Sequence, residues 1–239
     1  MKRQHLFNWY QTPKGKLLQQ AEANFIRRSI TVSCKQIVLQ IGGLGWEQNF
    51  IDCSLYENFI ILDANALGCE NANKIQAKAY SLPLQSDSID LILLPHMLEF
   101  DAHRFRTMRE IERVLKPEGH LIIVNFNPWS FWVRYQYLTN KKIPDSWTGH
   151  FIAKRRVMDW LKLLNFETKS ESEFNVESSQ TVVKGHFKVG YFSFVSTAYA
   201  IRAIKRRYTL IPLGKEAVKR PRLAIFNGIE SSQRLRNDD

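Results

Sequence analysis

Residues 37–45 read Ile-Val-Leu-Gln-Ile-Gly-Gly-Leu-Gly, and residues 59–63 read Phe-Ile-Ile-Leu-Asp. The first stretch is an apolar run that ends in clustered glycines, and the second, about 20 residues later, is an apolar run that ends in an acid. This order is typical of the start of a nucleotide-binding α/β domain. Gly42, Gly43 and Gly45 let the backbone approach a ligand where a Cβ would collide. Asp63 is placed to accept hydrogen bonds from ribose hydroxyls. The pair predicts an adenosine-containing ligand.

The segments around this start alternate between helical and strand patterns. Apolar residues at helical spacing over 7–30, with Thr12-Pro13 as cap and first turn, predict a helical prefix (1–30) that covers one side of a sheet. Four apolar runs lack alternation, which is typical of strands buried on both faces. They are residues 37–41, 59–62, 89–94, which Pro95 is expected to stop, and 121–124.

The second half of the chain continues the alternation. Helical periodicity covers 103–116 and 154–164, and Gly119 is expected to take the positive φ that caps the first of these helices. Two strands close in sequence, from 166 and over 191–203, follow. We therefore predict a single α/β domain over 1–213, with an aromatic insertion at 129–150 and a basic, loosely ordered tail at 214–239.

Composition limits the class of protein. With 239 residues, 44% of them hydrophobic, the chain can bury one good core. It has no apolar stretch of the roughly 20 residues that cross a bilayer, and its N-terminus is polar, so we expect a cytoplasmic protein. Cys34, Cys53 and Cys69 lack the paired spacing of zinc or redox motifs, so free thiols and no metal site are expected.

The net charge of +11 lies largely late in the chain. Lys205-Arg206-Arg207 is followed by further basic residues up to Arg236. Such a distribution attracts nucleic acid or an acidic surface, although solvated surface charge is the more common explanation.

Several short motifs between Ser81 and Val124 occur in a characteristic order. They are Ser-Leu-Pro-Leu-Gln-Ser-Asp-Ser-Ile-Asp-Leu-Ile-Leu from Ser81, His-Met-Leu-Glu-Phe from His96, and Arg-Glu-Ile-Glu-Arg-Val-Leu-Lys-Pro-Glu-Gly from Arg109. This stretch resembles the middle of a class I S-adenosylmethionine-dependent methyltransferase. Residues 9–15 and 126–130 more narrowly resemble an uncharacterised bacterial branch, the YafS-type methyltransferase-like proteins.

The resemblance implies a Rossmann-like, seven-stranded sheet, mostly parallel with an antiparallel last strand and helices on both faces. It implies S-adenosylmethionine as cofactor and a methyl acceptor that we expect to be a small molecule. Gly42, Gly43, Gly45 and Asp63 then hold the cofactor, with backbone amides beside Tyr80 and Ser81 holding its adenine.

The first loop departs from the family pattern. Gln40 stands where the family has an acid, and Leu44 and Trp46 stand where it has its second and third glycines. Shifting the register by one recovers Gly43 and Gly45 but places Glu47 on the third glycine. Trp46 either stacks on the ligand or occupies the pocket. Lys78 replaces the Asp that often holds the adenine amino group in the family.

His96 follows the 89–94 strand at the edge where open α/β sheets bind ligands, so it is the candidate base for an acceptor hydroxyl or amine. Its alternative role is a hydrogen bond to a neighbour. Asn125 and Asn127 are expected either to line an acceptor pocket or to form a turn. Glu99 and Asp101 are expected to cap a helix starting near Ala102 rather than to bind a metal.

Two hypotheses remain. The first is S-adenosylmethionine-dependent methyl transfer, and the second is a methyltransferase-fold protein that has lost catalysis and acts as a binding or regulatory module through its basic tail. An NAD-dependent oxidoreductase is disfavoured, because the third glycine of its loop would fall on Gln48.

Overall fold

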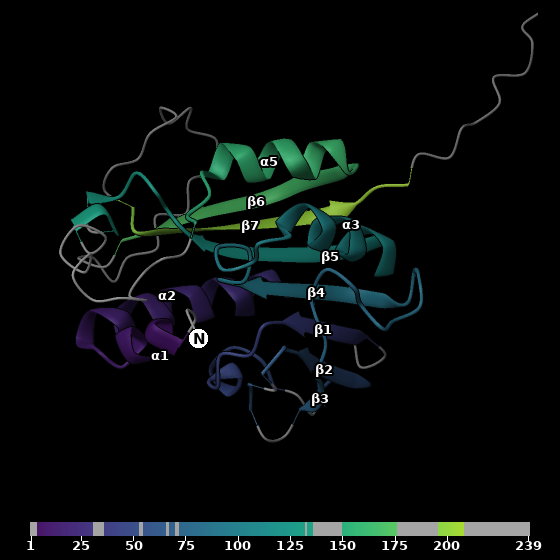
Figure 1. Cartoon of the computed structure of the whole chain (residues 1–239), viewed down its shortest axis with the longest axis horizontal. Coiled ribbons are helices and arrows are strands. Elements are labelled where there is room, and N and C mark those ends of the chain that lie inside the picture. The colour runs from purple at the N-terminus through teal and green to yellow at the C-terminus, as the bar shows by residue number, and fades with distance from the viewer. Residues whose placement is uncertain are drawn as a thin grey trace, which may run out of the picture. The chain divides into compact units, whose positions relative to one another are not determined.

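A seven-stranded sheet runs through the computed structural model in the order β3-β2-β1-β4-β5-β7-β6 (Figure 1). Strands β3, β2, β1, β4 and β5 pair in parallel, whereas β7 runs antiparallel to both β5 and β6. The strands are β1 (Ile37–Ile41), β2 (Asn58–Leu62), β3 (Asn73–Ile75), β4 (Ile89–Pro95), β5 (Leu115–Phe126), β6 (Phe166–Phe174) and β7 (Ala198–Lys205). The predicted fold class is confirmed.

The structure describes residues 4–30, 36–52, 55–65, 67–69, 72–131, 133–135, 150–175 and 196–207. They belong to a unit that extends from Met1 to Arg207. The tail predicted at 214–239, most of the aromatic insertion, and Cys34 and Cys53 lie outside the described residues. Cys69 is a buried free thiol.

Helices cover both faces of the sheet (Figure 1). Side chains alternate along the central strands, so that Leu91 and Leu93 of β4 pack with the N-terminal helices while Ile92 and Leu94 pack against the opposite helices. The helices are α1 (Gln4–Tyr10), α2 (Pro13–Ser29), the 3₁₀ turn η1 (Glu47–Asn49), α3 (Arg104–Val114) and α5 (Lys154–Leu163). In the described part of the chain, none of them is long and apolar enough to span a membrane.

The corner between α1 and α2 is tightly built. Thr12 caps α2, since its Oγ1 accepts a hydrogen bond from the Gly15 amide at 3.1 Å. A Cβ on Gly15 would lie 2.2 Å from the Trp9 carbonyl oxygen. Glycine at this position therefore allows α1 to fold back on α2, which places Tyr10 over the end of β4.

The predicted cap after α3 is wrong. The helix ends at Val114, and the positive φ of 62° belongs to Glu118 rather than to Gly119. Gly119 serves a close approach instead, because a Cβ there would lie 2.8 Å from the Lys116 carbonyl oxygen.

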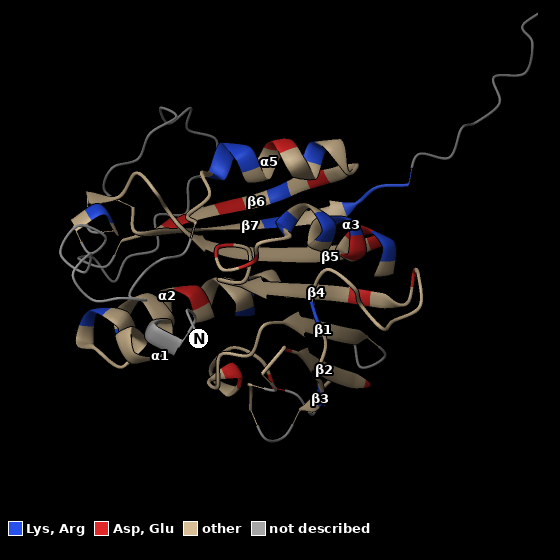
Figure 2. Ribbon diagram, viewed as in Figure 1, with Lys and Arg blue, Asp and Glu red and all other residues tan. Residues whose placement is uncertain are grey.

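Charged side chains are mixed in sign over the described elements. Figure 2 shows acidic and basic bands interspersed on α3, α5 and β6. Lys205 and Arg206, at the start of the basic segment, pair with Asp87 and Glu167. The basic residues beyond Arg207 lie outside the described residues.

Candidate active site where the parallel strands end

The glycine loop follows β1 and requires each of its glycines. Gly42 and Gly45 have positive φ values of 93° and 86°, a conformation that side chains disfavour. A Cβ on Gly43 would lie 2.0 Å from the Leu67 carbonyl oxygen. The loop is therefore packed against the segment that follows β2, and its glycines serve both backbone conformation and close approach.

A fully buried carboxylate, that of Glu47, fills the inside of this loop. It accepts hydrogen bonds from the amides of Leu44 at 2.6 Å, Gly45 at 3.0 Å and Cys69 at 3.1 Å. The Gln40 side-chain amide adds a fourth donor at 2.9 Å. Backbone N–H groups that converge in a loop form an anion site, and here the chain supplies the anion itself.

This arrangement accounts for Gln40 at the position where an acid was expected. An acid at 40 would face the Glu47 carboxylate, whereas the amide of Gln40 donates to it and to the Gly42 carbonyl oxygen. Sequence reasoning missed Glu47 as a site residue. The sequence did indicate it in one way: the acid that the family has at position 40 is replaced by an amide, and an acid stands at position 47 instead.

Asp63 lies at the end of β2, as predicted, and its carboxylate faces the glycine loop. Its Oδ2 accepts from the Gly43 amide at 3.1 Å, and its Oδ1 accepts from the Asn65 amide at 2.8 Å. The side chain is buried. The structure thus brings Asp63 together with Gly42, Gly43 and Gly45.

His96 lies just beyond β4, fully buried and with a positive φ of 48°. Its Nε2 is 2.8 Å from the Tyr10 hydroxyl and 3.0 Å from Glu22 Oε1, and its Nδ1 is 3.3 Å from Glu99 Oε2. The Tyr10 hydroxyl donates to Glu22 Oε2 at 2.8 Å. We call Tyr10, Glu22, His96 and Glu99 the His96 cluster.

The two carboxylates decide the charge of this histidine. Burial by itself lowers the pKa of His96, but the charges and hydrogen bonds of Glu22 and Glu99 outweigh burial and raise that pKa from 6.5 to about 9. At neutral pH the ring is therefore an imidazolium that donates from both nitrogens.

The prediction that Glu99 caps a helix is wrong. Glu99 is buried, and its second oxygen accepts from the Phe126 amide at the end of β5. Asp101 does serve the start of α3, because it accepts from the His103 amide at 2.7 Å and from the Thr107 hydroxyl.

Tyr80 and Ser81 lie in the turn before β4. The Tyr80 ring packs edge-on against His103, with ring centroids 4.6 Å apart, and Lys78 Nζ lies 5.7 Å from the Tyr80 ring centre. The Ser81 amide donates to the Lys78 carbonyl oxygen at 3.0 Å. The contacts of this turn are thus with the start of α3.

Asn125, near the end of β5, and Asn127, just after it, both have structural partners. Asn125 Nδ2 donates to the buried Tyr199 hydroxyl at 3.2 Å. Asn127 accepts from the Trp129 amide at 3.1 Å and donates to Ser196. The turn role expected for Asn127 is confirmed.

A cavity of about 10 Å³ lies between the N-terminal helices and the ends of β4 and β5, with room for about one water molecule. The Trp46 indole lines this inner cavity and packs on Tyr10, with ring centroids 4.5 Å apart. The residues that line the inner cavity are Gln19, Glu22, Ala23, Ile26, Leu44, Trp46, Phe50, Pro95 and Val124.

Comparison with known proteins identifies the family of the chain. A family model described as a methyltransferase domain matches residues 35–123. The uncharacterised protein YafS of Escherichia coli is 31% identical over 168 residues, which is 70% of this chain and 68% of that protein. The chain belongs to the class I S-adenosylmethionine-dependent methyltransferases.

Solved class I methyltransferases share the fold at low identity. One from Thermotoga maritima, a possible histamine N-methyltransferase, gives a TM-score of 0.62 at 20% identity and covers 83% of this chain and 93% of its own. The N-methyltransferase NodS of Bradyrhizobium japonicum, solved with S-adenosylhomocysteine, gives 0.56 at 11% identity, covering 82% and 90%.

The polar groups of this methyltransferase fit part of the expected cofactor. The Asp63 carboxylate beside the Gly43 amide suits a ribose with its hydroxyl donors. The amides of Leu44 and Gly45, however, are taken by Glu47, and the inner cavity is far smaller than the cofactor. The Asp63 and Gly43 pair therefore matches the ribose, whereas Glu47 occupies the amides of Leu44 and Gly45 in this conformation.

Proposed function

We propose that this chain transfers a methyl group from S-adenosylmethionine to a small-molecule acceptor. The observation that carries the proposal is the buried Asp63 carboxylate at the end of β2, 3.1 Å from the Gly43 amide of the glycine loop. Asp63 would hold the ribose hydroxyls, the backbone of Gly43 to Gly45 would lie along the cofactor, and the backbone beside Tyr80 would hold the adenine. The Ser81 amide already donates to the Lys78 carbonyl oxygen and would have to exchange that bond.

The cofactor supplies a methyl group on a positively charged sulfur, so the protein has to align the reactants and take a proton from the acceptor. An imidazolium cannot take that proton. The Glu22 carboxylate lines the inner cavity, and both of its oxygens are held, one by Tyr10 and one by His96. We assign proton acceptance to Glu22. The His96 imidazolium positions this carboxylate and balances its negative charge.

The two N-terminal helices act as the cover of the site. Tyr10 comes from α1 and Glu22 from α2, whereas His96 and Glu99 follow β4. In this conformation the two helices dock on the end of β4 through the His96 cluster. Docking excludes water, which strengthens each electrostatic interaction inside the site.

Calorimetric titration with S-adenosylmethionine and S-adenosylhomocysteine tests the proposal. We expect micromolar binding that Asp63→Ala abolishes and that the control Glu57→Ala, at an exposed acid before β2, leaves unchanged. If neither compound binds at millimolar concentration, the enzyme proposal fails and the methyltransferase-fold binding module takes its place.

A further inference from the structure

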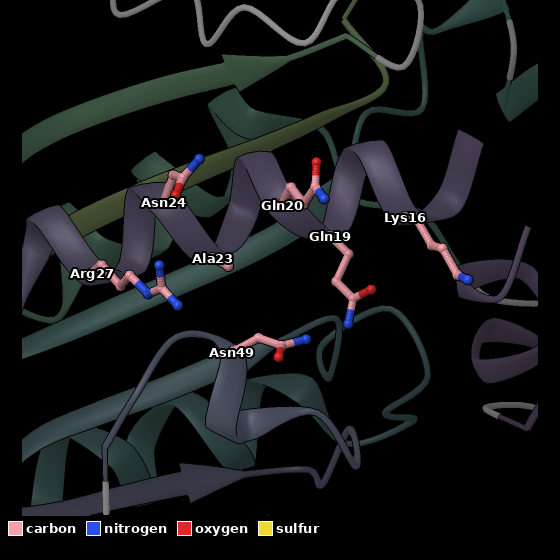
Figure 3. A pocket seen from close by; sticks show the side chains of 7 residues that line it. All are labelled: Lys16, Gln19, Gln20, Ala23, Asn24, Arg27 and Asn49. Atoms are coloured by element: carbon pink, nitrogen blue, oxygen red, sulfur yellow. The ribbon is translucent and has the colours of Figure 1, made fainter. Parts of the chain in front are cut away.

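A polar groove of about 430 Å³ runs between α2 and η1. Lys16, Gln19, Gln20, Ala23, Asn24 and Arg27 line it from α2, and Asn49 lines it from η1. The α2 residues follow one another at intervals of three and four, so they form one stripe along the helix. Figure 3 shows Gln19 and Arg27 extending from α2 toward the loop that carries Asn49. The volume is in the range of small-molecule sites.

The chemistry of the groove selects an anion. Lys16 and Arg27 stand at its two ends, separated by about 16 Å along the helix at 1.5 Å per residue. Four side-chain amides lie between or beside them, and none of the described residues that line the groove is Asp or Glu. Amides donate and accept hydrogen bonds, so they suit a ligand that carries polar groups between charged ends.

On surface helices, Lys and Arg often have an acidic side chain three or four residues away as an ion-pair partner. Neither Lys16 nor Arg27 has an Asp or Glu three or four residues away in the sequence. The single acid of α2, Glu22, is buried and bonded to Tyr10 and His96. The positive charge of the groove is therefore not balanced from within its own helix.

The groove adjoins the candidate reaction centre. Gln19 and Ala23 line both the groove and the inner cavity, which Glu22, Leu44 and Trp46 also line. Ala23 carries the smallest side chain at this junction. The groove and the inner cavity beside Glu22 therefore meet at Gln19 and Ala23.

We propose that this groove binds the methyl acceptor and that the acceptor is a small molecule with a carboxylate or phosphate group. Its identification as the acceptor site rests on the proposed methyl transfer. Anion binding itself does not, because it depends only on the groove.

The test uses the full chain, with citrate as carboxylate probe, tripolyphosphate as phosphate probe and glycerol as neutral control. We expect citrate, tripolyphosphate or both to shift the side-chain amide resonances of Gln19 and Asn49 saturably, while that of exposed Gln85 stays in place. Which of the two anions binds more tightly distinguishes a carboxylate ligand from a phosphate ligand. Glycerol should cause no shift.

A matched pair of double variants supplies the second arm. Lys16→Gln with Arg27→Gln should weaken probe binding at least tenfold, whereas Lys14→Gln with Arg28→Gln removes the same charge from exposed positions of α2 outside the groove and should change it less than twofold. Equal weakening by both pairs, or shifts that do not saturate, would overturn the inference. Titration of the first pair with S-adenosylmethionine separates this failure from failure of the proposed function, because the cofactor site lies elsewhere.

Discussion

Replacement of Glu47 tests whether a carboxylate from the chain itself holds the glycine loop. In Glu47→Ala, the buried amides of Leu44 and Cys69 lose their acceptor. The part-buried Gly45 amide loses its acceptor too, while the Gln40 side-chain amide keeps its bond to the Gly42 carbonyl oxygen. Each buried donor without a partner costs about 1–3 kcal/mol, so the two buried amides alone should lower the free energy of unfolding by at least about 2 kcal/mol. A loss of this size is readily measured against the roughly 5–15 kcal/mol that stabilises a typical domain.

The conservative variant Glu47→Gln keeps one acceptor oxygen. That oxygen can still serve Leu44, Gly45 and Gln40, which contact Oε1, whereas the Cys69 amide would face an NH₂ group in place of Oε2. We expect a loss of about 1–3 kcal/mol. This variant keeps the prediction testable if Glu47→Ala does not fold.

Urea unfolding followed by tryptophan fluorescence measures both variants, since Trp46 lies beside the loop. Glu57→Ala and Glu57→Gln serve as exposed controls and should remain within about 0.5 kcal/mol of the original chain. If Glu47→Ala is as stable as these controls, the loop does not depend on Glu47 and the assignment is wrong.

The other predictions concern the His96 cluster and the basic segment. Because the pKa of His96 rises from 6.5 to about 9 on folding, its stabilisation is complete below pH 6.5 and is lost as the pH rises to 9, a fall of about 3 kcal/mol. Urea unfolding of His96→Gln across this range should show a flatter pH dependence, and an unchanged slope would contradict the charge assignment. Tyr10→Phe and Glu22→Ala should be non-additive by about 0.5–3 kcal/mol in a double-mutant cycle, because each removes the same hydrogen bond; strict additivity would argue against the contact. If the basic residues after Arg207 contact nucleic acid, affinity for a mixed-sequence RNA should fall steeply with salt, and a flat salt series would exclude that role.

The parts of the fold that follow from local patterns were predictable. The buried strands β1, β2 and β4 are mostly apolar runs without alternation, and Thr12-Pro13 marks the start of α2, so periodicity and capping rules suffice. The pairing of Asp63 with the glycine loop also follows, because parallel strands that are neighbours end at the same edge of the sheet. These features depend on residues close together in sequence or on one topological rule.

The chemistry of the site depended on contacts that no local pattern carries. Glu22 reaches His96 only because α2 docks across the sheet, and its position inside a helix suggested nothing beyond an ordinary polar residue. An acid just before a helix usually caps it, and this rule predicts a cap at Glu99. Its two carboxylate oxygens instead bind the buried His96 ring and the Phe126 amide. In the sequence, Glu47 stands out only because it occupies the position of the family's third glycine.

The insertion of β7 between β5 and β6 has a consequence for biosynthesis. β5 and β6 leave the ribosome before β7 does, but each pairs with β7 and not with the other. Until β7 arrives, a nascent chain exposes the unpaired edge of β5, and such edges recruit foreign strands. Late closure by a distant strand slows folding and prolongs this exposure. Nascent chains that stop short of Ala198 should therefore be the ones that depend most on chaperones.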